Sequence, residues 1–181
     1  MRNGKGIALL AFVLMTVVAV GGCGAIEEKL EPKGTVNMAA NDAKKPAETL
    51  MWKLFQECGR QGNADSTYEA FSEDARQTKN LREDVEKLEE FLSDATSYEC
   101  GGVAENGWNA DMEMILFVRF ESESGPKRMK IRATLPEDGD APEIESIEAS
   151  PDDGSAFSND PYAPDEKFVG IRISPNAVRK M

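Results

Sequence analysis

Cysteine, tyrosine and carboxylate side chains are the groups in this sequence that could do chemistry, because its 181 residues contain no histidine. This composition excludes Ser-His-Asp and Cys-His catalytic arrangements, and also zinc sites ligated by histidine. Acid–base chemistry stays open to side chains that line a cavity, and the candidates are Tyr68, Tyr98, Asp111 and Glu113. In a chain with 33 acidic residues most carboxylates belong to a solvated surface, so we assign no catalytic residue and favour a protein that is not an enzyme.

Two acidic segments, at residues 137–140 and 152–160, could hold calcium. Neither has the ligand spacing of an EF-hand, and both are rich in the residues that form turns. The sequence also contains no glycine motif that would bind phosphate. We therefore predict no metal and no cofactor.

The first 23 residues fall into three zones that predict export. Arg2 and Lys5 precede an apolar run over residues 7–20, which is followed by Gly21, Gly22 and Cys23. A membrane-spanning helix needs roughly 20 consecutive apolar residues and this run has about 14, so it is typical of a signal peptide. An ordinary secretory signal, in which Cys23 has no role, is the alternative.

The end of this segment, Val-Gly-Gly-Cys at residues 20–23, resembles the lipobox of bacterial lipoproteins. The resemblance implies removal of residues 1–22 and attachment of palmitate or similar acyl chains to Cys23. Two or three acyl chains anchor a protein firmly, so the membrane is the first expected partner. The expected location is the cell membrane, on the side facing away from the cytoplasm.

The two remaining cysteines, Cys58 and Cys100, form an even pair in a domain predicted to be exported. A disulfide between them is one hypothesis, and two buried free thiols are the other. The sequence favours neither.

The net charge disfavours nucleic acid as a partner, and we predict none. It is −12 for the whole chain, and loss of Arg2 and Lys5 with the signal peptide makes it −14. Binding to phosphate backbones depends on clustered cations, which are outnumbered here.

Residues 23–45 are small and charged without periodicity, and predict a flexible linker. A single domain is expected over residues 46–174, followed by a tail at residues 175–181. Its first helix begins near Pro46 and ends at Gly59 and Gly62, and its apolar positions are Leu50, Met51, Leu54, Phe55 and Cys58. A short second helix is indicated by the capping-box spacing of Ser66 and Glu69, and a third by apolar residues recurring over residues 81–92.

After these helices the period of the apolar residues changes to that of extended strands. It predicts strands at residues 97–105, 111–121, 127–135, 143–149 and 168–173. Gly101 and Gly102 suggest a bulge or a close backbone approach in the first strand. The second is apolar on both faces at its middle and should be central in the sheet. Ile144 and Ile147 break strict alternation, which leaves the register of the fourth strand open.

Two groups of side chains are candidates for binding. A ligand pocket in the concavity of the sheet could be lined by an apolar group, for which ordinary core packing is the favoured alternative: Trp52, Trp108, Met112, Met114 and Met129. A basic patch on the opposite face could contact an anionic polymer or a partner, or could be screened by Glu121 and Glu123: Arg119, Arg128, Lys130 and Arg132.

Helices followed by an antiparallel sheet are similar in order to the cystatin-like, nuclear transport factor 2-like α+β fold, in which helices pack on a curved sheet. Residues 88–102, with the Ser-Tyr-Glu-Cys-Gly-Gly run, resemble a family of small bacterial lipoproteins grouped as a domain of unknown function. Residues 48–71 and 165–173 are also similar to that family. The resemblance implies this fold and a cellular location, and it implies no reaction.

These observations favour a membrane-anchored, extracytoplasmic lipoprotein with a non-catalytic module that binds an unknown ligand or envelope protein. One alternative is an enzyme that uses carboxylate and tyrosine side chains in the sheet concavity. The other is a structural accessory subunit of an envelope complex.

Overall fold

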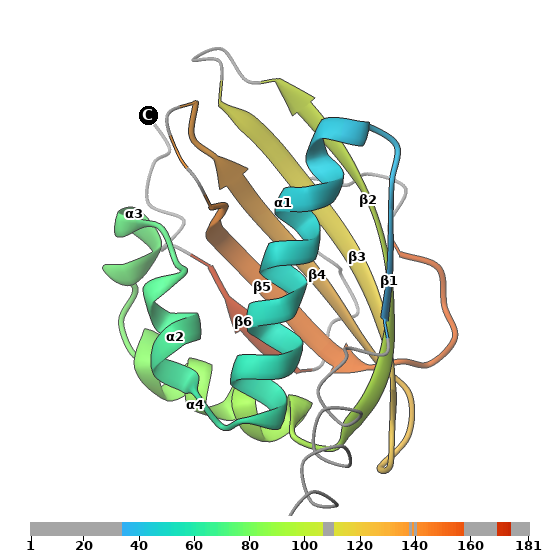
Figure 1. Cartoon of the computed structure of the whole chain (residues 1–181). Helices are drawn as coiled ribbons and strands as arrows, with labels where there is room; N and C mark the ends of the chain where they lie inside the picture. The colour runs from blue at the N-terminus through green and yellow to red at the C-terminus, as the bar shows by residue number, and fades with distance from the viewer. Residues whose placement is uncertain (1–33, 107–110, 138, 140, 158–169, 175–181) are drawn as a thin grey trace, which may run out of the picture. The chain divides into compact units, whose positions relative to one another are not determined.

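The computed structural model describes residues 34–106, 111–137, 139, 141–157 and 170–174. Within them, six strands form one sheet in the order β1-β2-β3-β4-β5-β6, which is also their order in the sequence. The helices all lie between β1 and β2 in the sequence, and they cover one face of the sheet (Figure 1). The predicted α+β class is confirmed. The predicted signal peptide, Cys23 and the predicted tail lie outside the described residues.

The first strand, β1 (Gly34–Met38), lies inside the segment that we predicted as linker. It pairs in parallel with β2 (Ala95–Asn106), from Gly34 opposite Tyr98 to Met38 opposite Gly102. Val36 is its one buried residue, so β1 lacks the repeated apolar positions that reveal a strand in a sequence. Three expectations are corrected: the linker is shorter than residues 23–45, the domain begins before residue 46, and the sheet is mixed rather than antiparallel.

The helix α1 (Asn41–Trp52) continues without interruption into a π-helical segment, η2 (Lys53–Arg60). Its predicted apolar positions are confirmed as buried: Leu50, Met51, Leu54, Phe55 and Cys58. Pro46 lies inside α1 rather than at its start. Gly62 follows η2 with a φ of 67°, as expected for a glycine that ends a helix, whereas Gly59 lies within η2. A Cβ at Gly59 would approach the Cβ of Leu92 to 2.9 Å, so this glycine permits close helix packing.

Three further helices complete the layer. The short helix α2 (Ala64–Glu69) is capped by Asn63, whose side chain accepts a hydrogen bond from the Ser66 N–H at 3.2 Å. The hydroxyl of Ser66, which we predicted as the cap, donates instead to the carboxylate of Glu57. A four-residue helix that the sequence did not predict, α3 (Glu73–Arg76), follows, with Ser72 as its cap. The long helix α4 (Leu81–Leu92) has the predicted bounds.

From β2 onward the strands form an antiparallel meander. The strands are β3 (Met112–Ser122), β4 (Lys127–Leu135), β5 (Glu143–Pro151) and β6 (Ile171–Ile173). The predicted central position of β3 is confirmed, because two or more strands lie on each side of it. Gly102 makes the predicted close approach, since a Cβ there would lie 2.5 Å from the carbonyl oxygen of Ile115.

A bulge in β5 explains the apolar pattern that left its register open. Ala133 pairs with Ile144 and Arg132 pairs with Ser146, so Glu145 is an extra residue on β5. The extra residue reverses the alternation of the side chains. Ile144 and Ile147 therefore both lie in the core, each with no exposed surface.

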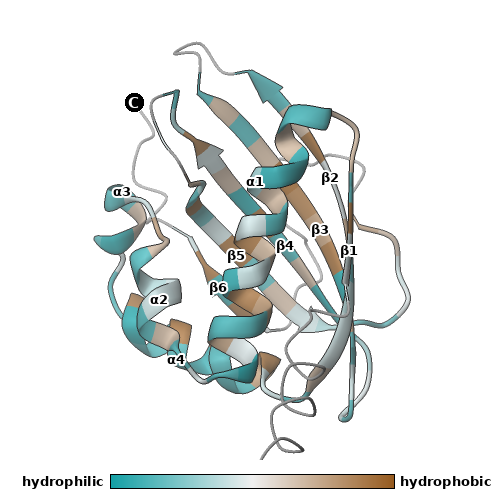
Figure 2. Ribbon diagram, in the orientation of Figure 1, coloured by the Kyte–Doolittle hydropathy of each residue, from teal (hydrophilic) through white to brown (hydrophobic). Residues whose placement is uncertain are grey.

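The space between the helices and the sheet is filled by the hydrophobic core. Figure 2 shows hydrophobic residues along β3, behind α1, and hydrophilic residues on much of the visible helix surface. The inward side chains of β3 and β4 are completely or almost completely buried: Met114, Leu116, Val118, Phe120, Met129 and Ile131. Phe55 of η2 packs edge-on against Tyr98, with ring centroids 5.0 Å apart, and is stacked on Phe120 at 6.4 Å.

A buried cation joins the end of α4 to the start of β4. The ammonium of Lys127 donates to the carbonyl oxygen of Phe91 and to the carboxylate of Asp94, and it lies 4.7 Å from the centre of the Phe91 ring. Hydrogen bonds from Lys127 and Ser124 lower the pKa of Asp94 to about 2. This contact fixes the helix-to-strand connection to the β3–β4 turn.

Candidate binding surface

The residues predicted to line a pocket do not come together as one. Met114 and Met129 are completely buried in the core, which was the favoured alternative, and Met112 packs against the edge of that core. Trp52 lies on α1 with 38% of its surface exposed. Trp108 falls outside the described residues. The concavity of the sheet is thus occupied by the protein's own side chains.

The four candidates for acid–base chemistry lie apart. Tyr98 is buried on the inner face of β2, and Glu113 lies on the opposite face of the sheet, where it pairs with Arg132. Tyr68 lies on α2 with the guanidinium of Arg82 4.9 Å from its ring centre. Asp111 accepts a hydrogen bond from the N–H of Glu137 at 3.0 Å. Within the described part of the chain these groups do not converge on one cavity.

Both remaining cysteines are free and buried, so the structure contains the thiols and not the disulfide. Burial raises the pKa of Cys58 to about 11 and that of Cys100 to about 12. A thiol of such high pKa is almost entirely protonated at neutral pH and is a poor nucleophile.

The face of the sheet turned away from the helices, here called the outer face, carries the predicted basic patch. Arg119 of β3 lies directly opposite Arg128 of β4, and Lys130 and Arg132 follow on the same side of β4. Like charges that face each other across two strands repel. Their proximity therefore requires nearby acceptors.

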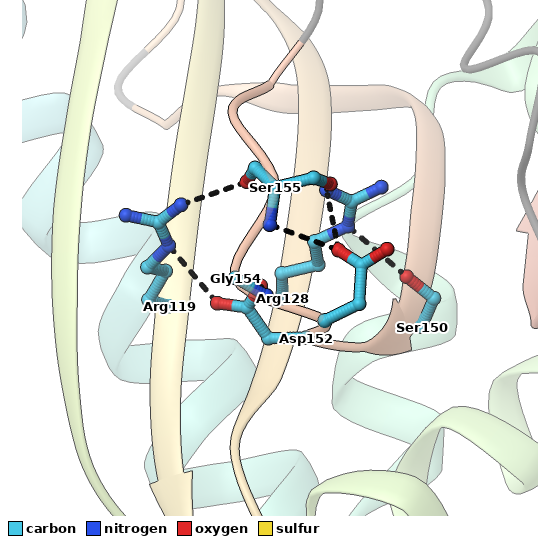
Figure 3. Close-up of polar contacts among 7 residues, drawn as sticks. Arg119, Arg128, Ser150, Asp152, Gly154 and Ser155 are labelled. Atoms are coloured by element: carbon cyan, nitrogen blue, oxygen red, sulfur yellow. Dashed lines mark hydrogen bonds and ion pairs between the residues drawn. The ribbon is translucent and has the colours of Figure 1, made fainter.

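The acceptors come from the segment that follows β5, residues 152–157, here called the acidic strap (Figure 3). The Nε of Arg119 donates to the carboxylate of Asp152 at 2.9 Å, and its Nη2 donates to the carbonyl oxygen of Ser155 at 3.0 Å. Nη1 of Arg128 donates to the hydroxyl of Ser155 at 2.7 Å, and it lies 3.8 Å from the carboxylate of Asp153. The strap thus binds both arginines through side-chain and backbone oxygens.

Local turn chemistry gives the acidic strap its shape. The carboxylates of Asp152 and Asp153 accept from the N–H groups of Gly154 and Ser155, at 2.9 and 3.0 Å. Gly154 has a φ of 78°, which glycine adopts without strain. Hydrogen bonds from Ser155 are the main cause that lowers the pKa of Asp153, and the charge of Arg128 contributes. The turn that the sequence predicted here therefore also positions two carboxylates.

An aromatic ring completes the cluster. Phe157, the last described residue of the strap, packs on Phe117 of β3 with ring centroids 5.0 Å apart. The guanidinium carbons of Arg119 and Arg128 lie 5.5 and 5.6 Å from the centre of the same ring. Cation–π contacts of this kind favour a planar guanidinium over an ammonium.

Ion pairs continue across the outer face beyond the strap. Arg132 contacts Glu113 at 3.2 Å, and Arg172 of β6 contacts Glu148 of β5 at 2.9 Å. We predicted four cations on this face, and the structure has them there. We named Glu121 and Glu123 as the carboxylates that could screen them. In the structure Asp152, Asp153 and Glu113 supply such carboxylates, and the role of the strap and of Phe157 was missed.

Comparisons with protein-family models, with curated proteins and with solved structures give no match. The resemblance to a lipoprotein family and to the cystatin-like fold therefore stays a prediction. In the part of the chain that the structure describes, no helix is both long enough and apolar enough to span a bilayer.

Proposed function

We propose that this protein is a lipid-anchored, extracytoplasmic, non-catalytic module that binds an anionic partner in the cell envelope through its outer face. The anchor rests on the sequence: the basic start, the short apolar run and the Val-Gly-Gly-Cys motif ending at Cys23. Replacement of Cys23 by Ser should release the protein from membranes and prevent the uptake of labelled fatty acid. Continued membrane association and labelling of that variant would contradict the anchor.

One observation supports binding more than any other: the paired arginines already hold an acidic segment. Arg119 and Arg128 donate to oxygens of Asp152 and Ser155, and both guanidinium groups lie close to the ring of Phe157. The side chains of Arg119 and Arg132 are still 49% and 48% exposed. A guanidinium has five N–H donors in a fixed fork that suits carboxylates, so Arg119 and Arg132 can donate to an external carboxylate in addition to the internal one.

The filled concavity favours the outer face over the inner one as the binding surface. An enzyme in the concavity would need a cavity and polar groups that converge on it, and the described inner face is apolar and packed. The binding hypothesis requires neither. Its ligand would be a carboxylate-bearing polymer or protein segment, by analogy with the chemistry of the strap.

Binding of poly-L-glutamate tests this proposal, with polyphosphate as a second anionic polymer that separates carboxylate recognition from charge alone. The Arg119→Gln/Arg132→Gln variant should bind poly-L-glutamate about tenfold more weakly per arginine, the loss expected for a hydrogen bond between charged groups. The control is Arg76→Gln/Lys79→Gln, which removes the same charge from exposed positions on the helical side. Equal losses in the two variants, or no binding by the wild type, would overturn the outer face as the site.

A further inference from the structure

The distance between the anchor and the domain is set by the finding that β1 begins at Gly34. Ten residues separate Cys23 from Gly34. Such a chain spans at most about 40 Å when fully extended, and its root-mean-square reach as a flexible coil is about 17–20 Å. If Cys23 carries lipid, the domain is therefore confined close to the headgroups, and one part of its surface must face them.

The ten residues between Cys23 and Gly34, here called the tether, join the domain at Gly34, whose partner Tyr98 contacts η2. Gly34 pairs with Tyr98, and a Cβ at Gly34 would lie 2.2 Å from that tyrosine ring. The Tyr98 ring also packs on Phe55 of η2, with ring centroids 5.0 Å apart. The guanidinium of Arg60, the last residue of η2, lies 5.8 Å from the centre of the Phe55 ring. A chain of contacts thus runs from the point of entry to the cationic end of η2.

The surface around this point exposes an aromatic side chain. Trp52 is one of two large hydrophobic side chains exposed in the described part of the chain. Glu48 is close enough to Tyr98 to act on it electrostatically, and Trp52 lies one helical turn further along the same face of α1. Tryptophan is enriched where proteins meet the bilayer interface, because its ring is apolar and its N–H can stay hydrated.

The charge of this region also suits a membrane surface better than the rest of the helical layer. Helix α1 and η2 together contain Lys44, Lys45, Lys53 and Arg60 against Asp42, Glu48 and Glu57, a net charge of +1. In α4, Arg82 and Lys87 stand against five acidic residues, a net charge of −3. The anionic lipids of a membrane attract nearby Lys and Arg and repel an acidic face. Within the helical layer, α1 and η2 are therefore the part that an anionic bilayer repels least.

We propose that Trp52, Lys53 and Arg60 form a membrane-contacting edge that rests on the anionic phospholipid surface to which Cys23 is anchored. The inference rests on the proposed lipid anchor and adds an orientation to it. Trp52 inserts among the headgroups, and Lys53 and Arg60 interact with lipid phosphates. The outer face lies on the opposite side of the sheet from α1, and so it stays accessible to a partner.

Quenching of Trp52 fluorescence by lipids tests the orientation. The full-length lipidated protein with Trp108→Phe, whose one remaining tryptophan is Trp52, is reconstituted into phosphatidylglycerol vesicles that carry brominated acyl chains. We expect a blue shift and a loss of Trp52 emission relative to vesicles without bromine. The matched control is the lipidated Trp52→Phe variant, whose one remaining tryptophan, Trp108, is not part of the proposed edge and should be quenched less. In the Trp108→Phe protein, Lys53→Gln with Arg60→Gln should weaken the attraction about fivefold per charge and reduce quenching.

Flotation of the same vesicles distinguishes a failure of the proposed lipid anchor from a failure of the membrane-contacting edge. Protein that floats with the vesicles while Trp52 is not quenched overturns the membrane-contacting edge and leaves the anchor in place. Quenching that is unchanged by the loss of both cations, or equal quenching of Trp108, also overturns the edge. Protein that does not float overturns the anchor, and the membrane-contacting edge with it.

Discussion

Arg119 and Arg128 face each other on neighbouring strands, and each guanidinium lies within 5.6 Å of the centre of the Phe157 ring. Two like charges keep this arrangement because the acidic strap supplies carboxylate, carbonyl and hydroxyl acceptors on the same side. The positive and negative charges of this cluster therefore balance locally. We expect the carboxylate of Asp152 to stabilise the protein more than that of Asp153.

Asp152→Asn should destabilise the protein by about 1–3 kcal/mol, because it removes the negative charge of the acceptor of Arg119 where two cations lie together. Asp152 has a side chain that is 7% exposed, and the side chain of Asp153 is 75% exposed. Asp153→Asn is therefore the control, and it should change the free energy of unfolding by no more than about 0.5 kcal/mol. Urea denaturation of the three proteins measures both values. Equal effects of the two substitutions would refute the proposed balance.

The ion pair between Asp94 and Lys127 predicts a pH dependence of stability. The pKa of Asp94 is lowered from 3.8 to about 2 in the folded protein, so its contribution is fully present above pH 4 and disappears as the pH falls through 2. Asp94→Asn should therefore be less stable than the wild type at pH 7 and lose that difference between pH 4 and 2. Thermal denaturation across this window, with the exposed Glu121→Gln as control, measures the difference. A difference as large at pH 2 as at pH 7 would exclude this linkage.

The neighbouring glycines of β2 should respond oppositely to alanine. A Cβ at Gly102 would lie 2.5 Å from a backbone oxygen, which cannot move aside cheaply, whereas the nearest atom to a Cβ at Gly101 is 3.8 Å away. Gly102→Ala should therefore destabilise by about 1–3 kcal/mol through overpacking. Gly101→Ala should be neutral or slightly stabilising, because alanine loses less backbone entropy on folding. Chemical denaturation curves distinguish the two, and a well-tolerated Gly102→Ala would mean that the strands are further apart.

Cys58 and Cys100 should resist thiol reagents in the folded protein. Both are buried, and their raised pKa values leave little thiolate at pH 7. Intact mass after treatment with a maleimide should show modification of neither residue under native conditions and of both in denaturant. The melting temperature should not change when a reductant is added. A mass two daltons lower before reduction, or a reductant-dependent melting temperature, would instead indicate the disulfide.

Sequence patterns predicted the elements with long, regular periodicity. The bounds of α4 and β4 and the central place of β3 follow from apolar residues that recur over many positions. β1 and α3 were missed because five and four residues are too few for a period to emerge, and their positions depend on partners distant in the sequence.

In the candidate binding surface, too, only the features that follow from a local sequence pattern were predicted. Alternation along β4 was enough to place Arg128, Lys130 and Arg132 on one face. The pairing of Arg119 with Arg128 needed the register of the β3–β4 hairpin, and the contact with Asp152 needed the path of the chain after β5. Neither is a property of local sequence. The Asp-Asp-Gly-Ser run signalled a turn and gave no sign that its carboxylates faced arginines.

The parallel pairing of β1 with β2 has a mechanical consequence. Any load on a tether attached upstream of Gly34 enters the domain at the first residue of β1, whose five residues all pair with β2. A pull directed along β1 strains these hydrogen bonds in shear, so they must fail together, whereas a pull across the sheet would peel them apart singly. The short edge strand β1, which sequence patterns did not reveal, is thus the element through which force on the predicted anchor would reach the rest of the domain.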